Sequence, residues 1–283
     1  MIPRQSFGLT GHASSQIIFG AYALSQATQV EADRILESLL AHGVNHIDTA
    51  PMYGNAEQCI GNWMKKQRDD FFLASKSRSR DYARAWKDLH ASLERLKVET
   101  IDLWQLHGLT NPAGWEKVMG PGGALQAFLK ARDQGLVRHL GVTGHGNKTP
   151  TMHLQSLERY AFDSVMLPYN YCQMQIASFA RDFDRLIEVC QARGVAVQTF
   201  QSIAWRPVSK QPRQYNTYFY DPLESQAAIE KSVHWAMGLP GSFVITAGDM
   251  QFVTRMLDAA GRFKQRPPDE EMAQLVQVYG MQP

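Results

Sequence analysis

The sequence predicts an α/β fold of the (β/α)8 or TIM-barrel class, as a single domain over residues 1–283. Eight short apolar runs with the character of strands are each followed by a stretch in which apolar residues recur at helical spacing. Strands that alternate with helices indicate parallel βαβ units, and eight such units fill the roughly 250 residues of a barrel. The length would also fit two domains, but no linker or low-complexity stretch divides the chain.

The predicted strands are bounded by turn residues and start roughly 25–50 residues apart. In chain order they span 17–19, 45–48, 71–74, 101–106, 137–142, 163–167, 195–200 and 242–245. Each predicted helix carries apolar residues three and four positions apart, which form one apolar stripe. The helices span 31–41, 56–66, 83–97, 124–133, 152–159, 179–192, 225–237, 251–260 and 269–279.

A doubly wound sheet is the alternative arrangement of the same elements. It normally carries a glycine-rich GxGxxG turn after the first strand. Residues 20–25, which follow the first strand here, read Gly-Ala-Tyr-Ala-Leu-Ser and contain no such turn. The barrel is therefore favoured.

Composition excludes several classes of protein. The chain is 44% hydrophobic and 20% charged with a net charge of +2, so neither disorder nor a nucleic-acid partner is indicated. No apolar run approaches the roughly 20 residues that span a bilayer, and no secretory signal begins the chain. Three widely spaced cysteines argue against a disulfide framework. We expect a cytoplasmic protein, monomeric or weakly associating, without membrane contact.

Two long segments do not belong to the repeating scaffold. Residues 108–123 follow the fourth predicted strand and contain two prolines and five glycines. Residues 201–223 follow the seventh and combine aromatic side chains with arginine and lysine. Both would lie at the carboxyl ends of the strands, where barrel active sites sit. Loops of this length are usually functional, so we expect these two to border the active site.

Ionisable side chains stand at the carboxyl ends of successive predicted strands. They are Asp48, Lys76 and His107, and Tyr53 follows Asp48 by five positions. A free phenol, with a pKa near 10, is a weak acid; a neighbouring ammonium ion stabilises its phenolate and lowers that pKa. This set can protonate an oxygen that gains electrons, but it contains no nucleophile–base pair. It therefore requires a hydride donor. The HxH pair of barrel metallohydrolases is absent, so no metal is expected.

Three motifs, in matching order and spacing, resemble those of the aldo-keto reductases. Residues 43–57 read GVNHIDTAPMYGNAE, residues 73–76 read LASK, and residues 101–107 read IDLWQLH. The resemblance implies that Tyr53 is the general acid, that Lys76 and Asp48 tune it, and that His107 orients the substrate carbonyl. It implies a reduced nicotinamide cofactor, usually NADPH with NADH possible, and a small aldehyde or ketone substrate. Residues 4–15 resemble the hairpin that closes the bottom of the barrel.

The resemblance also implies cofactor-binding positions, spread over the strand ends. They are Gly20, Ala21, Tyr22, Thr143, Gly144, Met166, Phe200, Gln201, Ser202, Ile203, Thr246 and Gly248. Two of them depart from the family pattern, because Gly144 and Met166 stand where side-chain amides usually bind the nicotinamide carboxamide. His145 or Asn170 is a candidate to replace them.

The residues after the eighth strand depart from the family pattern as well. Asp249 lies where a lysine or serine commonly binds the 2′-phosphate of NADPH, and its charge would repel that group. The cations that could replace the missing one are Arg206, Lys210, Arg213 and Arg255.

The substrate pocket is expected to be aromatic, with Tyr22, Trp104 and Trp115 in its walls. Little chain follows the last helix, so we expect a relatively open pocket with no tail over His107. The favoured function is carbonyl reduction. The alternative is a nicotinamide-binding, redox-sensing regulatory subunit of the same fold with little turnover, to which the departures at Gly144 and Met166 point.

Overall fold

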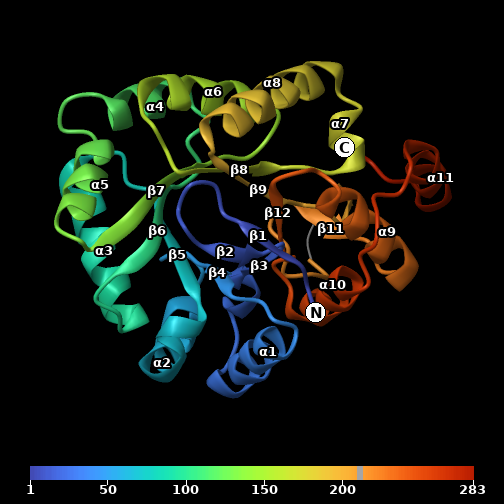
Figure 1. The fold of residues 1–283 in the computed structure, drawn as a ribbon, viewed down its shortest axis with the longest axis horizontal. Coiled ribbons are helices and arrows are strands. Elements are labelled where there is room, and N and C mark those ends of the chain that lie inside the picture. The colour runs from blue at the N-terminus through green and yellow to red at the C-terminus, as the bar shows by residue number, and fades with distance from the viewer. Residues whose placement is uncertain (209–212) are drawn as a thin grey trace.

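The computed structural model describes residues 1–208 and 213–283. At its centre is a closed barrel of eight parallel strands in the order β12-β3-β4-β5-β6-β7-β8-β9 (Figure 1). The strands are β3 (Ile17–Gly20), β4 (His46–Asp48), β5 (Phe72–Ser77), β6 (Ile101–Leu106), β7 (Val137–Thr143), β8 (Ser164–Pro168), β9 (Ala196–Phe200) and β12 (Ser242–Ile245). The predicted barrel is confirmed, and the doubly wound sheet is excluded.

Helices surround the barrel in the view of Figure 1. They are α1 (Gln29–Ala41), α2 (Ala56–Gln67), α3 (Tyr82–Leu96), α4 (Pro112–Met119), α5 (Ala124–Asp133), α6 (Thr149–Arg159), α7 (Tyr171–Met174), α8 (Ala177–Arg193), α9 (Gln226–Met237), α10 (Met250–Gly261) and α11 (Asp269–Tyr279). Within residues 1–208 and 213–283, none of these helices is long and apolar enough to cross a bilayer.

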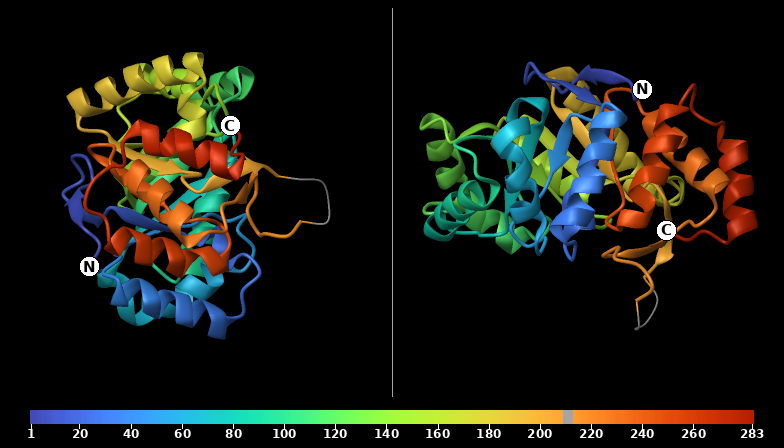
Figure 2. Two further views of the ribbon diagram at one scale, coloured as in Figure 1. Left: turned by 90° about the vertical axis from the view of Figure 1, so that its right-hand side faces the viewer. Right: turned by 90° about the horizontal axis from the view of Figure 1, so that it is seen from below.

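Different segments lie at the two ends of the barrel (Figure 2). At the amino end, β1 (Arg4–Ser6) pairs with β2 (Ala13–Ser15) in the hairpin expected over 4–15. Phe7, in the turn of this hairpin, is fully buried and packs on Phe72 and Phe243 at ring-centroid distances of 5.5 and 4.9 Å. Phe7 thus fills the interior of the barrel at its amino end, and a cavity of about 600 Å³ lies beside the hairpin, between its turn and the first residues of β5 to β7.

Side chains of each strand alternate between the barrel interior and the helices. In β6, Leu103 belongs to the interior apolar cluster, whereas Trp104 stacks on Phe128 of α5 with ring centroids 3.6 Å apart. This period of two is the geometry of an extended strand. It sends Leu103, Gln105 and His107 to one face of the strand, and the last two of these reach the upper half of the barrel.

Both segments expected to be long loops contain regular structure. Residues 108–123 hold α4, which begins with a proline and is capped by Asn111, whose Oδ1 accepts a hydrogen bond from the Gly114 N–H at 3.0 Å. Residues 201–223 hold the antiparallel pair β10 (Ala204–Pro207) and β11 (Tyr220–Pro222). In Figure 2 this pair lies at the end of the barrel opposite the amino-terminal hairpin.

Candidate active site

A cavity of about 400 Å³ opens at the carboxyl ends of the barrel strands. Each of the eight barrel strands contributes a lining residue, either from the strand itself or, as with His107 after β6, from the residue directly after it. The lining residues are Gly20, Tyr22, Asp48, Met52, Tyr53, Lys76, Arg78, His107, Gly108, Thr143, His145, Met166, Phe200, Gln201, Thr217, Tyr218, Phe219, Tyr220, Ile245, Thr246 and Gly248. The cavity therefore lies where a barrel of this class places its chemistry.

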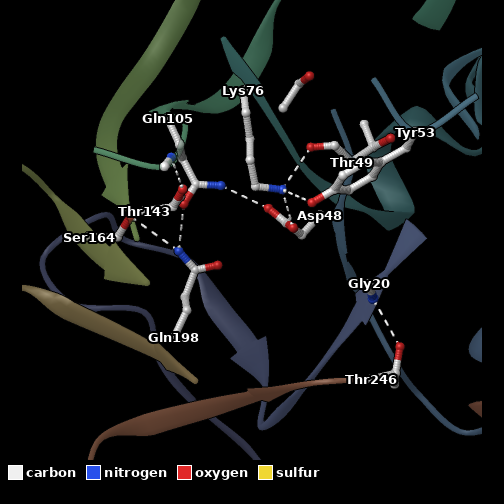
Figure 3. Close-up of polar contacts among 12 residues, drawn as sticks. Gly20, Asp48, Thr49, Tyr53, Lys76, Gln105, Thr143, Ser164, Gln198 and Thr246 are labelled. Atoms are coloured by element: carbon white, nitrogen blue, oxygen red, sulfur yellow. Dashed lines mark hydrogen bonds and ion pairs between the residues drawn. The ribbon is translucent and has the colours of Figure 1, made fainter. Parts of the chain in front are cut away.

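Lys76 is the centre of the polar contacts in this cavity (Figure 3). Its ammonium group donates to Asp48 Oδ2, to the Thr49 carbonyl at 2.9 Å and to the Tyr53 hydroxyl at 3.3 Å. An ammonium group has three donors, and all three are used. Lys76 is 1% exposed and Asp48 2% exposed. The structure thus brings these three predicted side chains together with fixed geometry.

Burial and charge set the protonation of this group. Burial alone would lower the pKa of Lys76, but Asp48 and Tyr53 together raise it above that of a free lysine. Burial raises the pKa of Asp48, against the opposing effects of Lys76 and of a hydrogen bond from Gln105. Burial also raises the pKa of Tyr53, and Lys76 offsets only part of this increase. The net direction for Tyr53 is opposite to the expected one, because loss of water disfavours the phenolate more than the ammonium favours it.

His107 is held by its backbone. Its N–H donates to the Ser77 carbonyl at 2.8 Å, and its own carbonyl accepts from Arg80 Nη2 at 3.0 Å. The next residue, Gly108, has φ +64° and donates its N–H to Thr143 Oγ1 at 3.1 Å. The imidazole faces the edge of the Tyr53 ring at a centroid distance of 6.1 Å. A ring fixed in this way can direct a nitrogen to the same part of the cavity as the Tyr53 hydroxyl, so that one oxygen atom of a bound molecule can contact both groups.

Two histidines face the cavity as neutral imidazoles. Burial, followed by the charges of Lys76 and Arg78, lowers the pKa of His107 well below its usual range and that of His145 to about 4. The Nδ1 atoms of both rings are buried and have no hydrogen-bond partner among the described residues. Each ring therefore retains a polar atom for a bound molecule.

A row of buried side-chain amides lies beside the Lys76–Asp48 pair (Figure 3). Gln105 donates from Nε2 to Asp48 Oδ1 at 2.8 Å, and its Oε1 accepts from Gln198 Nε2 at 3.0 Å. Gln198 also lies 3.3 Å from Ser164 Oγ. Sequence reasoning did not assign a role to Gln105. Its position two residues before His107 on the inward face of the strand was the available signal.

The nicotinamide positions implied by the sequence fall into two groups. Eight of the twelve line the cavity: Gly20, Tyr22, Thr143, Met166, Phe200, Gln201, Thr246 and Gly248. The other four do not line it. Ala21 and Ile203 are buried in the outer hydrophobic core, and Gly144 and Ser202 are buried beside the cavity. The structure thus places most, but not all, of these residues on one surface.

Packing explains the glycine at position 144. A Cβ atom there would lie 2.6 Å from Cγ2 of both Thr110 and Thr149, so a larger side chain would require these two threonines to shift. The Gly144 N–H donates to the Met166 carbonyl at 3.0 Å. No side-chain amide stands at Gly144 or Met166, the two positions that depart from the family pattern. The neighbouring polar atoms that face the cavity belong to Thr143 and His145.

The turn after β9 has two features of a binding loop. Gln201 adopts φ +66°, a left-handed conformation that is unusual for a residue other than glycine. Ser202 Oγ is buried and has no hydrogen-bond partner among the described residues. Strained backbone and an unpaired buried hydroxyl are both costly, and a bound polar group at this turn would satisfy the hydroxyl.

Asp249 is the N-cap of α10. Its Oδ1 accepts from the Gln251 N–H at 3.0 Å, and its Oδ2 accepts from the Asn216 N–H at 2.8 Å. The Asn216 side chain in turn donates to Ser25 Oγ at 2.9 Å and to the Gly248 carbonyl at 3.1 Å. A carboxylate therefore already occupies the amide-rich end of this helix, which is where an anion would otherwise be stabilised.

The cations expected to replace a phosphate ligand have other partners. Arg206 donates to Asp221 at 3.1 Å, and Arg255 Nε donates to Gln226 Oε1 at 3.1 Å. The Arg213 guanidinium lies over the Tyr218 ring at 5.7 Å. Lys210 lies outside the described residues. The structure does not bring Arg206, Arg213 or Arg255 to the cavity wall.

Aromatic side chains after β10 cover part of the cavity. Phe219 packs on His145 at a centroid distance of 4.6 Å, and Tyr218 meets Tyr22 edge to face at 6.2 Å. The rings of Tyr218 and Phe219 remain 53% and 42% exposed. The expected aromatic rim is thus built from the segment that follows β9 and from Tyr22.

Two expected pocket residues lie elsewhere, and the prediction that they line the pocket is corrected. Trp104 faces outward onto Phe128, because the period of two in β6 turns Gln105 and His107 inward. Trp115, in α4, is 7% exposed and donates its indole N–H to Ser156 Oγ at 3.0 Å. Among the described residues, none after Gly248 lines the cavity.

The comparisons with known proteins agree on one family. The model of the Aldo/keto reductase family matches residues 16–264. An uncharacterized oxidoreductase of Schizosaccharomyces pombe is 30% identical over 203 residues, which cover 68% of this chain and 65% of that protein. An uncharacterized oxidoreductase of Bacillus subtilis is 27% identical over 181 residues, 59% of this chain and 56% of that protein. The matches thus span less than two thirds of these two curated relatives.

A solved structure shares the fold over its full length. An aldo-keto reductase from Klebsiella pneumoniae, crystallised in complex with NADPH, superposes with a TM-score of 0.71 at 19% identity and covers 100% of this chain and 97% of that one. The family match spans most of the chain and includes Asp48, Tyr53, Lys76 and His107. This chain therefore belongs to the aldo/keto reductase family.

Proposed function

We propose that the protein is an NADPH-dependent reductase that converts an aldehyde or ketone to the alcohol, with Tyr53 as the general acid. The observation that carries the proposal is the complete use of the Lys76 ammonium by Asp48, the Thr49 carbonyl and the Tyr53 hydroxyl. A lysine in this environment is held charged and directed at one phenol. That arrangement stabilises the phenolate that forms when Tyr53 gives up its proton.

The cavity fits a nicotinamide on one side. The wall of Thr143, Met166 and Phe200 provides a hydroxyl and an apolar surface, and Gln201 lines the cavity at the turn after β9. The hydroxyl of the next residue, Ser202, lies outside the lining but has no partner among the described residues, which suits a phosphate oxygen bound at this turn. The reduced nicotinamide, when bound, supplies the hydride. NADPH is the proposed form because a structural relative is known in complex with it. NADH remains the alternative because of Asp249.

The residues of the chain then have separate tasks. Tyr53 transfers its hydroxyl proton to the carbonyl oxygen as the carbonyl carbon becomes tetrahedral, so the product is a neutral alcohol. Lys76 stays charged and stabilises the phenolate left on Tyr53. His107 is neutral and presents a ring N–H to the same oxygen, which orients the carbonyl without competing for the proton.

The raised pKa of Tyr53 suits a group that donates a proton during reduction. A general acid must be protonated at the start of the step. Burial raises the pKa of Tyr53 above that of a free phenol, so the hydroxyl is protonated throughout the neutral range. The reverse reaction needs the phenolate and is disfavoured by the same shift.

The experiment is a turnover assay with a panel of neutral carbonyl compounds. Purified protein with NADPH and 4-nitrobenzaldehyde is expected to oxidise the nucleotide and to form 4-nitrobenzyl alcohol in equal amounts. Nucleotide binding is measured separately by fluorescence. Binding without reduction of any member of the panel would contradict the proposed enzyme, and absence of NADPH and NADH binding would contradict any nicotinamide-dependent function.

A redox-sensing regulatory subunit is the second candidate. It is favoured by Gly144 and Met166, which offer the carboxamide no side-chain amide, so that turnover could be poor while binding persists. The same two measurements separate the candidates: tight nucleotide binding with negligible reduction supports the sensor, and steady turnover supports the enzyme.

A further inference from the structure

An arginine that the proposed chemistry does not use lines the mouth of the cavity. Arg78 follows β5 directly, two residues beyond Lys76, and shares the cavity with Tyr53 and His107. Its side chain is exposed. Among the described residues its guanidinium makes one weak polar contact, from Nη1 to the Met52 sulfur at 4.0 Å. Arg78 therefore keeps its donors available at the entrance to the site.

No described residue neutralises the charge of Arg78. Among the described residues it forms no ion pair, whereas Arg206, which does not line the cavity, pairs with Asp221 at 3.1 Å. Asp48 is the single carboxylate among the described lining residues, and it is already bonded to Lys76 and Gln105. The part of the cavity open to solvent is therefore positive.

Arg78 lies across the barrel from the turn after β9, where we propose that the nucleotide binds. In the closed order of eight strands, β5 lies four strands from β9, on the opposite side of the mouth. The strained turn at Gln201 and the unpaired Ser202 hydroxyl follow β9. A ligand bound along that turn leaves Arg78 facing the remaining space, next to Met52 and Tyr53.

We infer that Arg78 is a specificity-determining residue, which binds an anionic group, a carboxylate, on the carbonyl substrate. A guanidinium binds a carboxylate through two parallel hydrogen bonds and is charged at every relevant pH. The substrate would place its carbonyl oxygen at Tyr53 and His107 and its carboxylate toward solvent at Arg78. Such compounds are aldehydes and ketones of the oxo-acid class, including carboxyl-substituted aromatic aldehydes. This inference rests on the proposed function.

The field of Arg78 reaches the reacting groups. After burial and Lys76, the charge of Arg78 is a further cause that lowers the pKa of both His107 and His145. The arginine is thus electrostatically coupled to the two imidazoles that face the cavity. An anionic substrate would bring a compensating charge to this group of cations.

The test compares 4-carboxybenzaldehyde with 4-nitrobenzaldehyde, two planar substrates of similar size of which only the first is charged. The measured quantity is the ratio of their kcat/KM values, so that electronic differences between the aldehydes cancel between variants. Arg78→Gln is expected to lower this ratio about tenfold, mainly through KM, as expected for loss of one charge-assisted contact. Arg78→Lys is expected to restore part of it.

Arg84→Gln is the matched control. It removes the same charge from a nearby exposed arginine of α3 that lies outside the cavity. The control is expected to leave the ratio unchanged. An unchanged ratio in Arg78→Gln, or an equal fall in the Arg84→Gln control, would overturn the assignment of Arg78.

A binding measurement keeps the inference testable without turnover. The dissociation constant of 4-(hydroxymethyl)benzoate is measured by calorimetry on the wild-type protein and on Arg78→Gln. About tenfold weaker binding to the variant supports the carboxylate site even if no aldehyde is reduced, in which case only the proposed function fails. Equal affinity for both proteins contradicts the site even if neutral aldehydes are reduced.

Discussion

The two sides of the cavity differ in how completely their polar groups are satisfied. On the side of β4, β5 and β6, Lys76 uses all three donors and Asp48 accepts at both oxygens. On the side of β7, β8 and β9, two positions lack side-chain amides, and the Ser202 hydroxyl has no partner among the described residues. The first side is fixed by contacts within the protein, and we propose that a bound nucleotide completes the second.

The difference follows from what each side has to do. The proton transfer that we propose for Tyr53 needs a side chain held within a few tenths of an ångström, which fits the several contacts that support it. Binding of a dinucleotide can use backbone groups and shape, which tolerate replacement of individual side chains. This fits the prediction that Gly144 and Met166, on the side where we propose that the nucleotide binds, depart from the family pattern.

The largest loss of activity is expected from replacing Lys76, whose ammonium group is the centre of the hydrogen bonds on the side of β4, β5 and β6. Lys76→Met removes the group that stabilises the Tyr53 phenolate, and kcat/KM for 4-nitrobenzaldehyde is expected to fall about 100-fold to 10,000-fold. The variant also leaves the buried Asp48 unpaired, which costs about 3–5 kcal/mol of stability and is measured by thermal unfolding.

A double variant separates these two consequences. Asp48→Asn combined with Lys76→Met removes both charges, so it is expected to recover most of the stability but none of the activity. Recovery of turnover in the double variant would show that Lys76 acts only on folding.

A smaller effect is expected at Gln105, which donates a hydrogen bond to Asp48. Gln105→Met keeps the size of the side chain but removes the donor to Asp48 Oδ1. Burial already raises the pKa of Asp48, and loss of this donor raises it further, so Lys76 is less well supported as a cation. We expect kcat to fall about tenfold, as for the loss of one hydrogen bond to a charged group. In alcohol oxidation, where Tyr53 must be a phenolate, the rising limb of the pH profile is expected to move to higher pH.

Gln198→Met is the matched control for this prediction. It removes the partner of Gln105 but leaves the contact to Asp48, so its effect is expected to be the weaker of the two. Equal effects on kcat and on the pH limb would assign the change to packing in the barrel interior and not to the hydrogen bond.

On the nucleotide side, Asp249→Asn is expected to sharpen cofactor preference. Asparagine retains one accepting oxygen for the cap of α10 but removes the charge that would oppose a 2′-phosphate. Affinity for NADPH, measured by fluorescence, is expected to rise about threefold relative to that for NADH. Asp258→Asn, which changes the same charge farther along α10, is the control. A fall in relative NADPH affinity in Asp249→Asn would contradict the placement of the phosphate.

The smallest expected effect is the pH dependence of reduction by the wild-type protein. The pKa of Tyr53 is raised and that of His107 is lowered well below its usual range, so neither group titrates near neutrality. The kcat/KM for a neutral aldehyde is expected to change less than about twofold between roughly pH 6 and pH 9, and to fall only where Tyr53 loses its proton. A transition near the pKa of a free histidine would show that His107 is solvated during catalysis.

The sequence predicted which residues lie together on the side of β4, β5 and β6, where the polar groups are hydrogen-bonded. Asp48, Tyr53, Lys76 and His107 come from contiguous motifs at the ends of consecutive strands, and parallel order alone brings strand ends together. The barrel and most element boundaries followed from hydrophobic period and length in the same way.

The predictions that failed depend on distant parts of the chain. The outward direction of Trp104 follows from strand alternation once Gln105 is known to point inward. The packing of Trp115 on Ser156 joins two helices that sequence spacing does not relate. The net rise in the pKa of Tyr53 comes from burial by the whole upper barrel, whereas the sequence indicated only its cationic neighbour.

The proposed chemistry is tested most directly by replacing Tyr53 with phenylalanine, which keeps the ring and removes the proton donor. NADPH binding and reduction of 4-nitrobenzaldehyde are measured on the same preparation of wild-type and Tyr53→Phe protein. We predict that the variant binds NADPH with wild-type affinity while kcat for reduction falls at least about 100-fold. Undiminished turnover in Tyr53→Phe would contradict the assignment of Tyr53 as the general acid.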